Sequence, residues 1–140
     1  MKTNLTRTMM LTAAMVTLGA AAAYAETKVV ANVPFSFRTN AGQQAPGRYG
    51  IVSMNQSAAV MGLRNLETGH LTVIGVGTPV GRYDGVSRSR LVFHCGSESG
   101  CALAEVWNGD GQGKKFSTPR LKSAELERIA VVYLDNKSAE

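Results

Sequence analysis

Residues 88–107, which read RSRLVFHCGSESGCALAEVW, contain the pattern that decides the fold. Two segments rich in β-branched and aromatic residues flank a turn of small and polar residues, which is typical of a β-hairpin. Cys95 and Cys101 stand at the two ends of that turn. Pairing them across the hairpin also sets Phe93 opposite Leu103 on the same face. We therefore predict two antiparallel strands joined by a Cys95–Cys101 disulfide.

This hairpin register contains one unfavourable pair. It sets Leu91 opposite Glu105, so an apolar side chain would face a charged one. A β-bulge, which adds one residue to one strand, corrects such a mismatch. We expect a bulge near Ala104 that returns Val106 to the core. We also expect the Cα atoms of the two cysteines to lie about 4.4–6.8 Å apart, as is usual in disulfides.

Further strands are predicted on both sides of the hairpin. Val29 to Phe37 alternates apolar and polar residues with a period of two, which indicates a half-buried strand. Pro34 cannot donate a ladder hydrogen bond, so we expect an edge strand or a strand with an edge-like stretch. Pro46 and Gly47 predict a turn. The remaining strands are expected at residues 48–54, 58–64 and 71–76, with the two hairpin strands at 88–95 and 101–107.

The C-terminal segment fits two structures. Leu126, Ile129 and Tyr133 have helical spacing, but residues 128–134 are also rich in strand formers. We expect a short helical turn near residues 118–125, because Thr118-Pro119 is typical of a helix start, and then a closing strand. The whole pattern predicts an all-β domain, a small antiparallel β-sandwich or barrel of six to seven short strands.

Residues 1–25 have the pattern of a cleaved signal peptide. Lys2 and Arg7 precede an apolar run at residues 9–23, and Ala23-Tyr24-Ala25 has the small-x-small pattern of a cleavage site. The apolar run is shorter than the ~20 residues that span a bilayer. We therefore expect residues 26–140 to form one exported domain, periplasmic or secreted, with no transmembrane segment.

The net charge bears on which partners the protein binds, and the cysteines bear on its cellular compartment. The chain has 15 basic and 10 acidic residues, a formal net charge of +5, and two of the basic residues lie in the signal segment. The exported domain is then only mildly basic, which argues against a nucleic-acid partner. Acidic envelope polysaccharide and lipid head groups remain candidate partners. A disulfide also fits an oxidising compartment.

One strand carries the candidate binding residues. Arg88, Arg90 and His94 share one face of the strand at 88–95, because every second side chain points the same way. Arg82 and Tyr83 stand in the preceding loop. These residues form a candidate surface for an anionic ligand. The alternative is a solvated outer strand face, on which arginines discourage edge-to-edge aggregation.

No catalytic or metal-binding pattern stands out. The chain has two histidines but no nucleophile elbow and no His-x-x-x-His spacing. Asn108, Asp110 and Gln112 resemble the start of a calcium loop, yet Pro119 stands where a bidentate glutamate is required. We expect no metal ion, no cofactor and no catalytic residue. The sequence favours an envelope binding or structural module without enzymatic activity; the alternative is a small hydrolase that uses His94.

Several short motifs resemble a group of small exported all-β proteins from environmental bacteria. The motifs are Ala31-Asn-Val-Pro-Phe-Ser-Phe37, Ala45-Pro-Gly-Arg-Tyr49, Leu91-Val-Phe-His94 and Glu105-Val-Trp107. The resemblance implies an exported all-β domain and transfers no activity or catalytic residue. Cys95 and Cys101 depart from the group's pattern, in which basic and aromatic residues occupy the hairpin.

Overall fold

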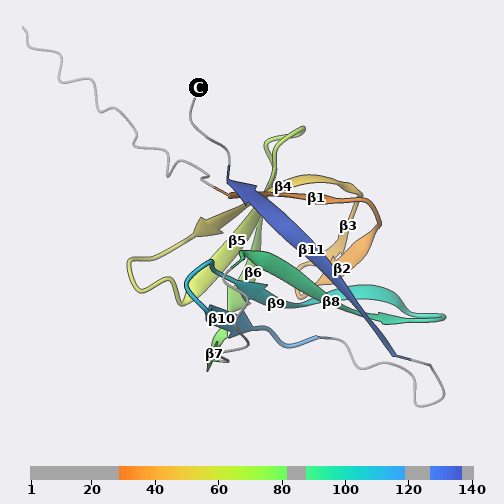
Figure 1. Cartoon of the computed structure of the whole chain (residues 1–140). Helices are drawn as coiled ribbons and strands as arrows, with labels where there is room; N and C mark the ends of the chain where they lie inside the picture. The colour runs from red at the N-terminus through yellow and green to blue at the C-terminus, as the bar shows by residue number, and fades with distance from the viewer. Residues whose placement is uncertain (1–28, 82–87, 119–126, 137–140) are drawn as a thin grey trace, which may run out of the picture.

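A computed structural model describes residues 29–81, 88–118 and 127–136. This part of the chain is all-β, with eleven strands in one curled sheet and no helix (Figure 1). The strands are β1 (Val29–Val33), β2 (Phe37–Thr39), β3 (Gly42–Gln44), β4 (Gly47–Ser53), β5 (Val60–Asn65), β6 (Leu71–Val76), β7 (Thr78–Gly81), β8 (Arg90–Gly96), β9 (Gly100–Trp107), β10 (Gln112–Lys115) and β11 (Arg128–Asn136).

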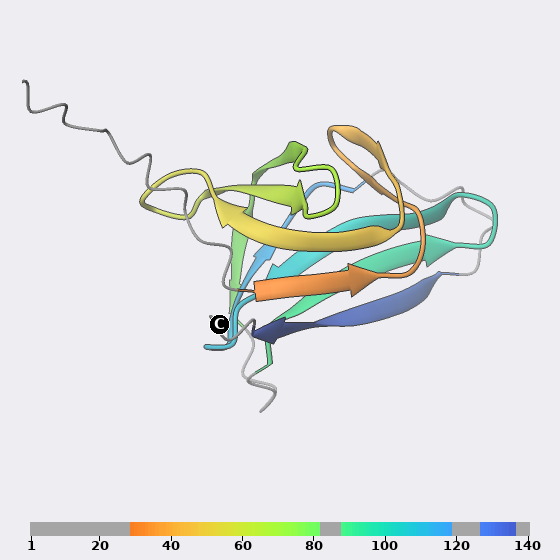
Figure 2. The ribbon, with the colours of Figure 1, turned by 90° about the horizontal axis from the view of Figure 1, so that it is seen from above.

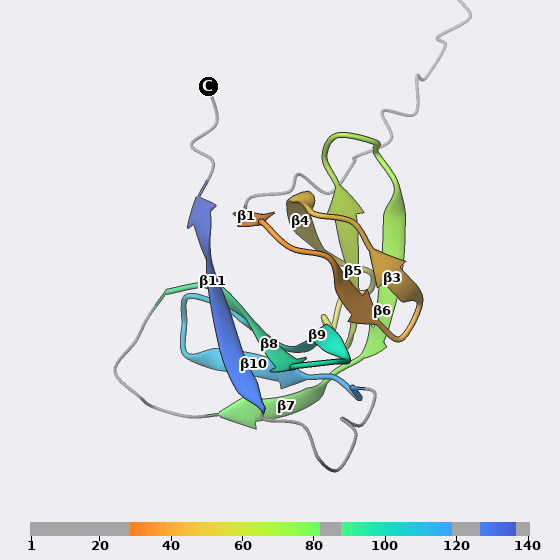
Figure 3. The same cartoon turned by 90° about the vertical axis from the view of Figure 1, so that its right-hand side faces the viewer.

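The strands follow the order β3-β2-β9-β8-β11-β1-β4-β5-β6, and β10 pairs with both β9 and β7. Figure 3 shows how this order curls, so that β8, β9 and β11 face β4, β5 and β6 across the interior. The two ends of the sheet approach each other at β3 and β6. There the Asn40 side-chain amide donates to the Ile74 carbonyl at 3.1 Å, and the Thr72 hydroxyl lies 3.3 Å from Gln44 Oε1. The result is a half-barrel that side chains help to close.

Aromatic side chains fill the centre of the half-barrel. The Phe93 ring of β8 lies edge-on to Phe37 at 5.2 Å and to Phe35 at 5.1 Å between ring centroids. Phe37 also contacts Tyr49 of β4 at 5.3 Å. Phe37, Tyr49 and Phe93 are almost completely buried. Edge-to-face packing is the favoured geometry for such rings, so this cluster joins the two halves of the curl.

The structure confirms the predicted hairpin. Cys95 and Cys101 form a disulfide, and Phe93 pairs with Leu103. The register shifts between Val92 and Phe93, so that Leu91 pairs with Val106. The extra residue is Ala104, at the position where the bulge was expected. The Cα separation was predicted wrongly, because it is 3.9 Å and so shorter than the expected range.

Three features of the expected sheet are corrected. The described residues form eleven strands and not six or seven, because β3, β7 and β10 are three or four residues long and lie in segments that read as loops. The sheet is mixed, since β2 runs parallel to β9. The predicted strand at 29–37 is not an edge strand, and of the two alternatives the structure favours a stretch around Pro34 that lies outside the ladder. The strand breaks at Pro34 into β1 and β2, and β1 lies between β11 and β4, so the missing donor falls in the break.

The C-terminal closing strand is confirmed as β11, and Figure 2 shows it beside β1 along one side of the sheet. The expected helical turn falls mostly on residues 119–126, and the signal segment on residues 1–25; both lie outside the described residues. In the described part, the structure has no helix with the length and apolar character needed to cross a bilayer.

Candidate functional site

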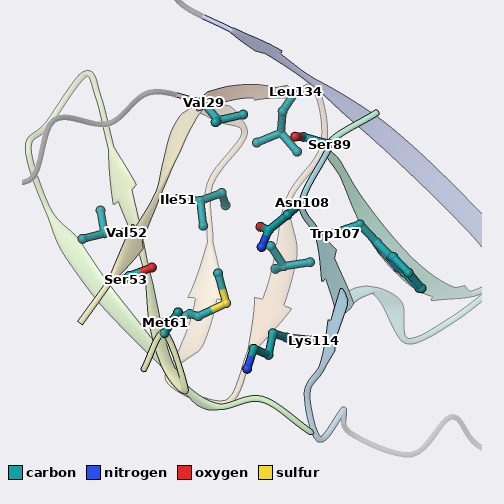
Figure 4. A pocket seen from close by; sticks show the side chains of 12 residues that line it. Val29, Ile51, Val52, Ser53, Met61, Ser89, Trp107, Asn108, Lys114 and Leu134 are labelled. Atoms are coloured by element: carbon teal, nitrogen blue, oxygen red, sulfur yellow. The ribbon is translucent and has the colours of Figure 1, made fainter. Parts of the chain in front are cut away.

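A hollow of about 280 Å³ lies inside the curl, where strands of both halves face each other (Figure 4). Most of its wall is apolar, and its polar side chains are few. It is lined by Val29, Ile51, Val52, Ser53, Ala58, Met61, Ser89, Val106, Trp107, Asn108, Lys114 and Leu134. We call it the inner hollow. It brings together residues from β1, β4, β5, β9, β10 and β11, which are far apart in the sequence.

The apolar part of this wall is held by the core. Met61 and Leu134 belong to the buried core cluster, and Val29 and Ile51 pack against it while remaining partly exposed. Side chains anchored in a close-packed core keep their positions. The hollow is therefore a continuation of the core surface, and an apolar molecule placed there would contact a fixed wall.

Among the described residues of this wall, only Lys114 is charged. It lies on β10 opposite Val106 of β9, and it is half-buried. Gly77 makes room for it, because a Cβ atom at Gly77 would lie 2.7 Å from the Cβ of Lys114. Figure 4 shows the lysine side chain reaching into the hollow on the side of Met61.

The predicted anion-binding residues are on the other side of the sheet. Arg90 and His94 are on the outer face of β8, as expected, and Arg88 precedes the strand. The Arg88 guanidinium lies 4.5 Å from the centre of the Tyr133 ring, and that of Arg90 lies 4.7 Å from the Trp107 ring. Arg90 is only 9% exposed, so it is largely covered. Arg82 and Tyr83 lie outside the described residues.

His94 forms an ion-pair contact on this outer face. Its Nδ1 lies 2.7 Å from Oε1 of Glu127, and its side chain is 28% exposed. Its neighbours in the sheet register are Ala102 on β9 and Ile129 on β11. The imidazole therefore has a carboxylate beside it but no serine or cysteine directly opposite it.

A second hollow, of about 370 Å³, lies on the outer face and is here called the outer hollow. It is lined by Val80, Gly81, Arg90, Val92, Glu105, Trp107 and Lys115. The Trp107 indole N–H donates to Glu105 Oε2 at 2.7 Å. The indole ring also packs against Gly113, where any Cβ atom would lie 2.7 Å from it. Arg90 and Glu105 thus both contact Trp107, while Lys115 is exposed.

An apolar stripe crosses the same outer face. Ile129, Val131 and Tyr133 alternate along β11 and are 65%, 43% and 45% exposed. They lie opposite His94, Val92 and Arg90 of β8. The solvent-exposed face of an antiparallel strand usually carries polar side chains. Three apolar side chains in succession on the exposed face of β11 are therefore unusual.

No protein-family model matches this chain, and no curated protein or solved structure matches it. The resemblance to small exported all-β proteins remains a prediction. Among the described residues, no group of three or more histidine, cysteine, aspartate or glutamate side chains is placed to hold a metal ion.

Sequence reasoning missed the inner hollow. Its residues come from six strands, and no local pattern shows which strands will face one another across the curl. The signal that was present is the pair Lys114-Lys115, because adjacent residues of a strand point to opposite faces. One of the two lysines had to point inward if this segment formed a strand.

Proposed function

We propose that this protein is an exported binding module, without enzymatic activity, that holds a small apolar ligand in the inner hollow. The single observation that supports it is an apolar hollow inside the half-barrel, with few polar groups on its wall. Ligand sites have this composition, and the mouth of a barrel is one of their usual places.

The alternative function, a small hydrolase that uses His94, has one supporting observation, the contact between His94 and Glu127. A histidine held by a carboxylate is two thirds of a catalytic triad. However, His94 lines neither of the two hollows, and Ala102 and Ile129 stand opposite it in the sheet. A nucleophile and a substrate pocket are both needed beside the imidazole. The arrangement therefore favours binding over catalysis.

Export is part of the proposal and rests on two observations. Residues 1–25 have the pattern of a signal peptide, and the Cys95–Cys101 disulfide is of a kind that persists in oxidising compartments. The exposed Arg88 of the outer face would then meet acidic polysaccharide or lipid head groups of the envelope.

A neutral fluorescent probe tests the proposed site. N-Phenyl-1-naphthylamine carries no charge and brightens in an apolar environment, so it reports entry into the inner hollow. We expect saturable binding of one probe per protein. Ile51→Phe, which fills the hollow, should weaken that binding at least tenfold. Val73→Phe is the matched control, because Val73 of β6 is 46% exposed and does not line the hollow.

Unchanged probe binding in Ile51→Phe, with the variant still folded by circular dichroism, would place the probe elsewhere and overturn the proposed site. Hydrolysis of ester substrates that disappears in His94→Gln would instead establish the alternative function.

A further inference from the structure

We infer that the ligand of the inner hollow is an apolar acid, whose carboxylate pairs with Lys114 while its hydrocarbon body contacts the apolar wall. This inference rests on the proposed function and adds the chemical class of the ligand.

The position of Lys114 is fixed by its neighbours. Lys114 pairs with Val106 of β9 and with Pro79 of β7, so the strand β10 is held on both sides. Gly77 lies against the base of its side chain and also against the Phe116 ring. The lysine stem is thus packed at its start, and Figure 4 shows the side chain along one side of the hollow, next to Met61. Such packing of the methylene stem is common for lysine.

The ammonium group meets no carboxylate on the described wall. None of the residues that line the inner hollow is acidic, and in the described chain no acidic side chain lies within 4.0 Å of Lys114. The nearest acidic residue in the sheet register is Glu105, which lies opposite Lys115 and bonds to Trp107 on the outer face. A cation beside apolar surface gains more from an anionic partner than a cation in free water.

Three further polar side chains stand on the same wall. Ser53, Ser89 and Asn108 each line the hollow, and each can donate a hydrogen bond to an oxygen. Figure 4 shows the Asn108 amide on the β9 side of the hollow, Ser53 on the β4 side, and both apart from Lys114. These neutral groups can add hydrogen bonds along the wall, and the charge preference of the site comes from Lys114. Its ammonium group attracts a carboxylate and repels a cationic head group.

The volume limits the size of the ligand. A hollow of about 280 Å³ is slightly smaller than the roughly 300–1,000 Å³ usual for ligand sites. At roughly 30 Å³ for each water-sized group, it accommodates about nine such groups. Octanoate, with about ten non-hydrogen atoms, is therefore a suitable probe, and larger molecules, the dye included, would extend through the opening.

The experiment compares three probes that share an eight-carbon chain: octanoate, octanol and octyltrimethylammonium. The affinity of each probe is measured by its displacement of N-phenyl-1-naphthylamine from the protein and, directly, by isothermal titration calorimetry. We expect octanoate to bind about fivefold or more tightly than octanol, as one favourable charge pair provides, and octyltrimethylammonium to bind most weakly. Added salt should reduce the advantage of octanoate.

Two neighbouring lysines supply the variant and its control. Lys114→Met keeps the length of the apolar stem and should remove the preference for octanoate over octanol. Lys114→Arg keeps the charge and should retain it. Lys115→Met changes the adjacent lysine, which lines the outer hollow, and should leave the preference unchanged. Thermal unfolding of each variant confirms that it is folded.

The outcomes separate this inference from the function on which it depends. Equal affinity for octanoate and octanol, or a preference that survives in Lys114→Met, overturns the apolar acid while leaving an apolar binding site. If Lys115→Met loses the preference for octanoate, the carboxylate binds in the outer hollow, and the inference that it pairs with Lys114 is overturned. Absence of binding by all three probes and by the neutral dye overturns the proposed function itself.

Discussion

The inner and outer hollows lie on opposite sides of the β9–β10 pair, and they differ in how their polar groups are engaged. The outer hollow is the larger, about 370 Å³ against 280 Å³, and it carries more charge. Two of its charged groups contact Trp107, since Arg90 lies over the ring and Glu105 accepts the N–H bond, and the third, Lys115, is exposed opposite Glu105. The inner hollow has one lysine on an apolar wall.

Under the proposed function, the concentration of cationic residues on the outer face is not what locates the binding site. Arg90 is among the most buried charged residues of the described chain, and its stacking on Trp107 gives it a structural role. Volume does not mark the site either. What distinguishes the inner hollow is apolar surface together with a cation that faces no carboxylate, and the following variants test the two sides separately.

The largest effect is expected from the inner side of β8. Phe93→Ala removes a fully buried ring that contacts Phe35 and Phe37, and we expect the free energy of unfolding to fall by about 3–5 kcal/mol. Val131→Ala, on the exposed face of the neighbouring strand, should change it by about 0.5 kcal/mol or less. Urea unfolding of both variants gives the comparison. Similar losses would show that the outer face is packed as tightly as the core.

The wall between the two hollows depends on a missing side chain. Gly113→Ala would place a Cβ atom 2.7 Å from the Trp107 ring, and we expect a loss of about 1–3 kcal/mol and altered tryptophan fluorescence. Gly81→Ala on β7 is the control, because a Cβ atom there meets nothing within 4 Å. Equal stability of the two variants would mean that Trp107 does not lie against β10.

The disulfide should affect stability without affecting binding. Cys95 and Cys101 are only six residues apart, so replacing both with alanine should cost at most about 2 kcal/mol of unfolding free energy. Neither cysteine lines the inner hollow, and the affinity for the neutral dye should therefore stay within twofold of the wild type. An unfolded double variant would contradict this account of the Cys95–Cys101 disulfide.

The smallest effect concerns the basic outer face. Arg88 is exposed, and it lies over Tyr133, a contact worth about 0.5–1 kcal/mol at such a site. Arg88→Gln should slightly lower the salt concentration at which the protein elutes from immobilised heparin. An unchanged elution position would mean that the arginine belongs to a merely solvated face. Binding of the neutral dye should not change.

The hairpin could be predicted from the sequence because its determinants are local. The Cys95–Cys101 pair sets the register, and that register alone makes Leu91 face Glu105, which requires the bulge at Ala104. The alternation at 29–37 also indicated a half-buried strand, and in β1 Ala31 and Val33 are buried while Asn32 is exposed. Local pattern did not reveal β3, β7 and β10, whose three or four residues are strands only because a partner strand is beside them.

The candidate site depended on long-range arrangement and could not be predicted in the same way. Val29, Ile51 and Leu134 meet only after β1 enters the sheet between β4 and β11. The outward positions of Arg90 and His94 followed from strand alternation, but their partners Trp107 and Glu127 did not. Period-two patterns tell which residues share a face; they do not tell which faces enclose a hollow.

The central claim, that the ligand enters the inner hollow and not the outer face, is tested most directly by methyl NMR spectra during a titration with N-phenyl-1-naphthylamine. The probe's aromatic rings shift the signals of methyl groups that they contact. We predict saturable shifts for Ile51, Met61 and Leu134, which line the inner hollow, and unchanged signals for Ile129 and Val131 on the exposed stripe of β11. Shifts of Ile129 and Val131 with unchanged signals for the inner residues would contradict the account.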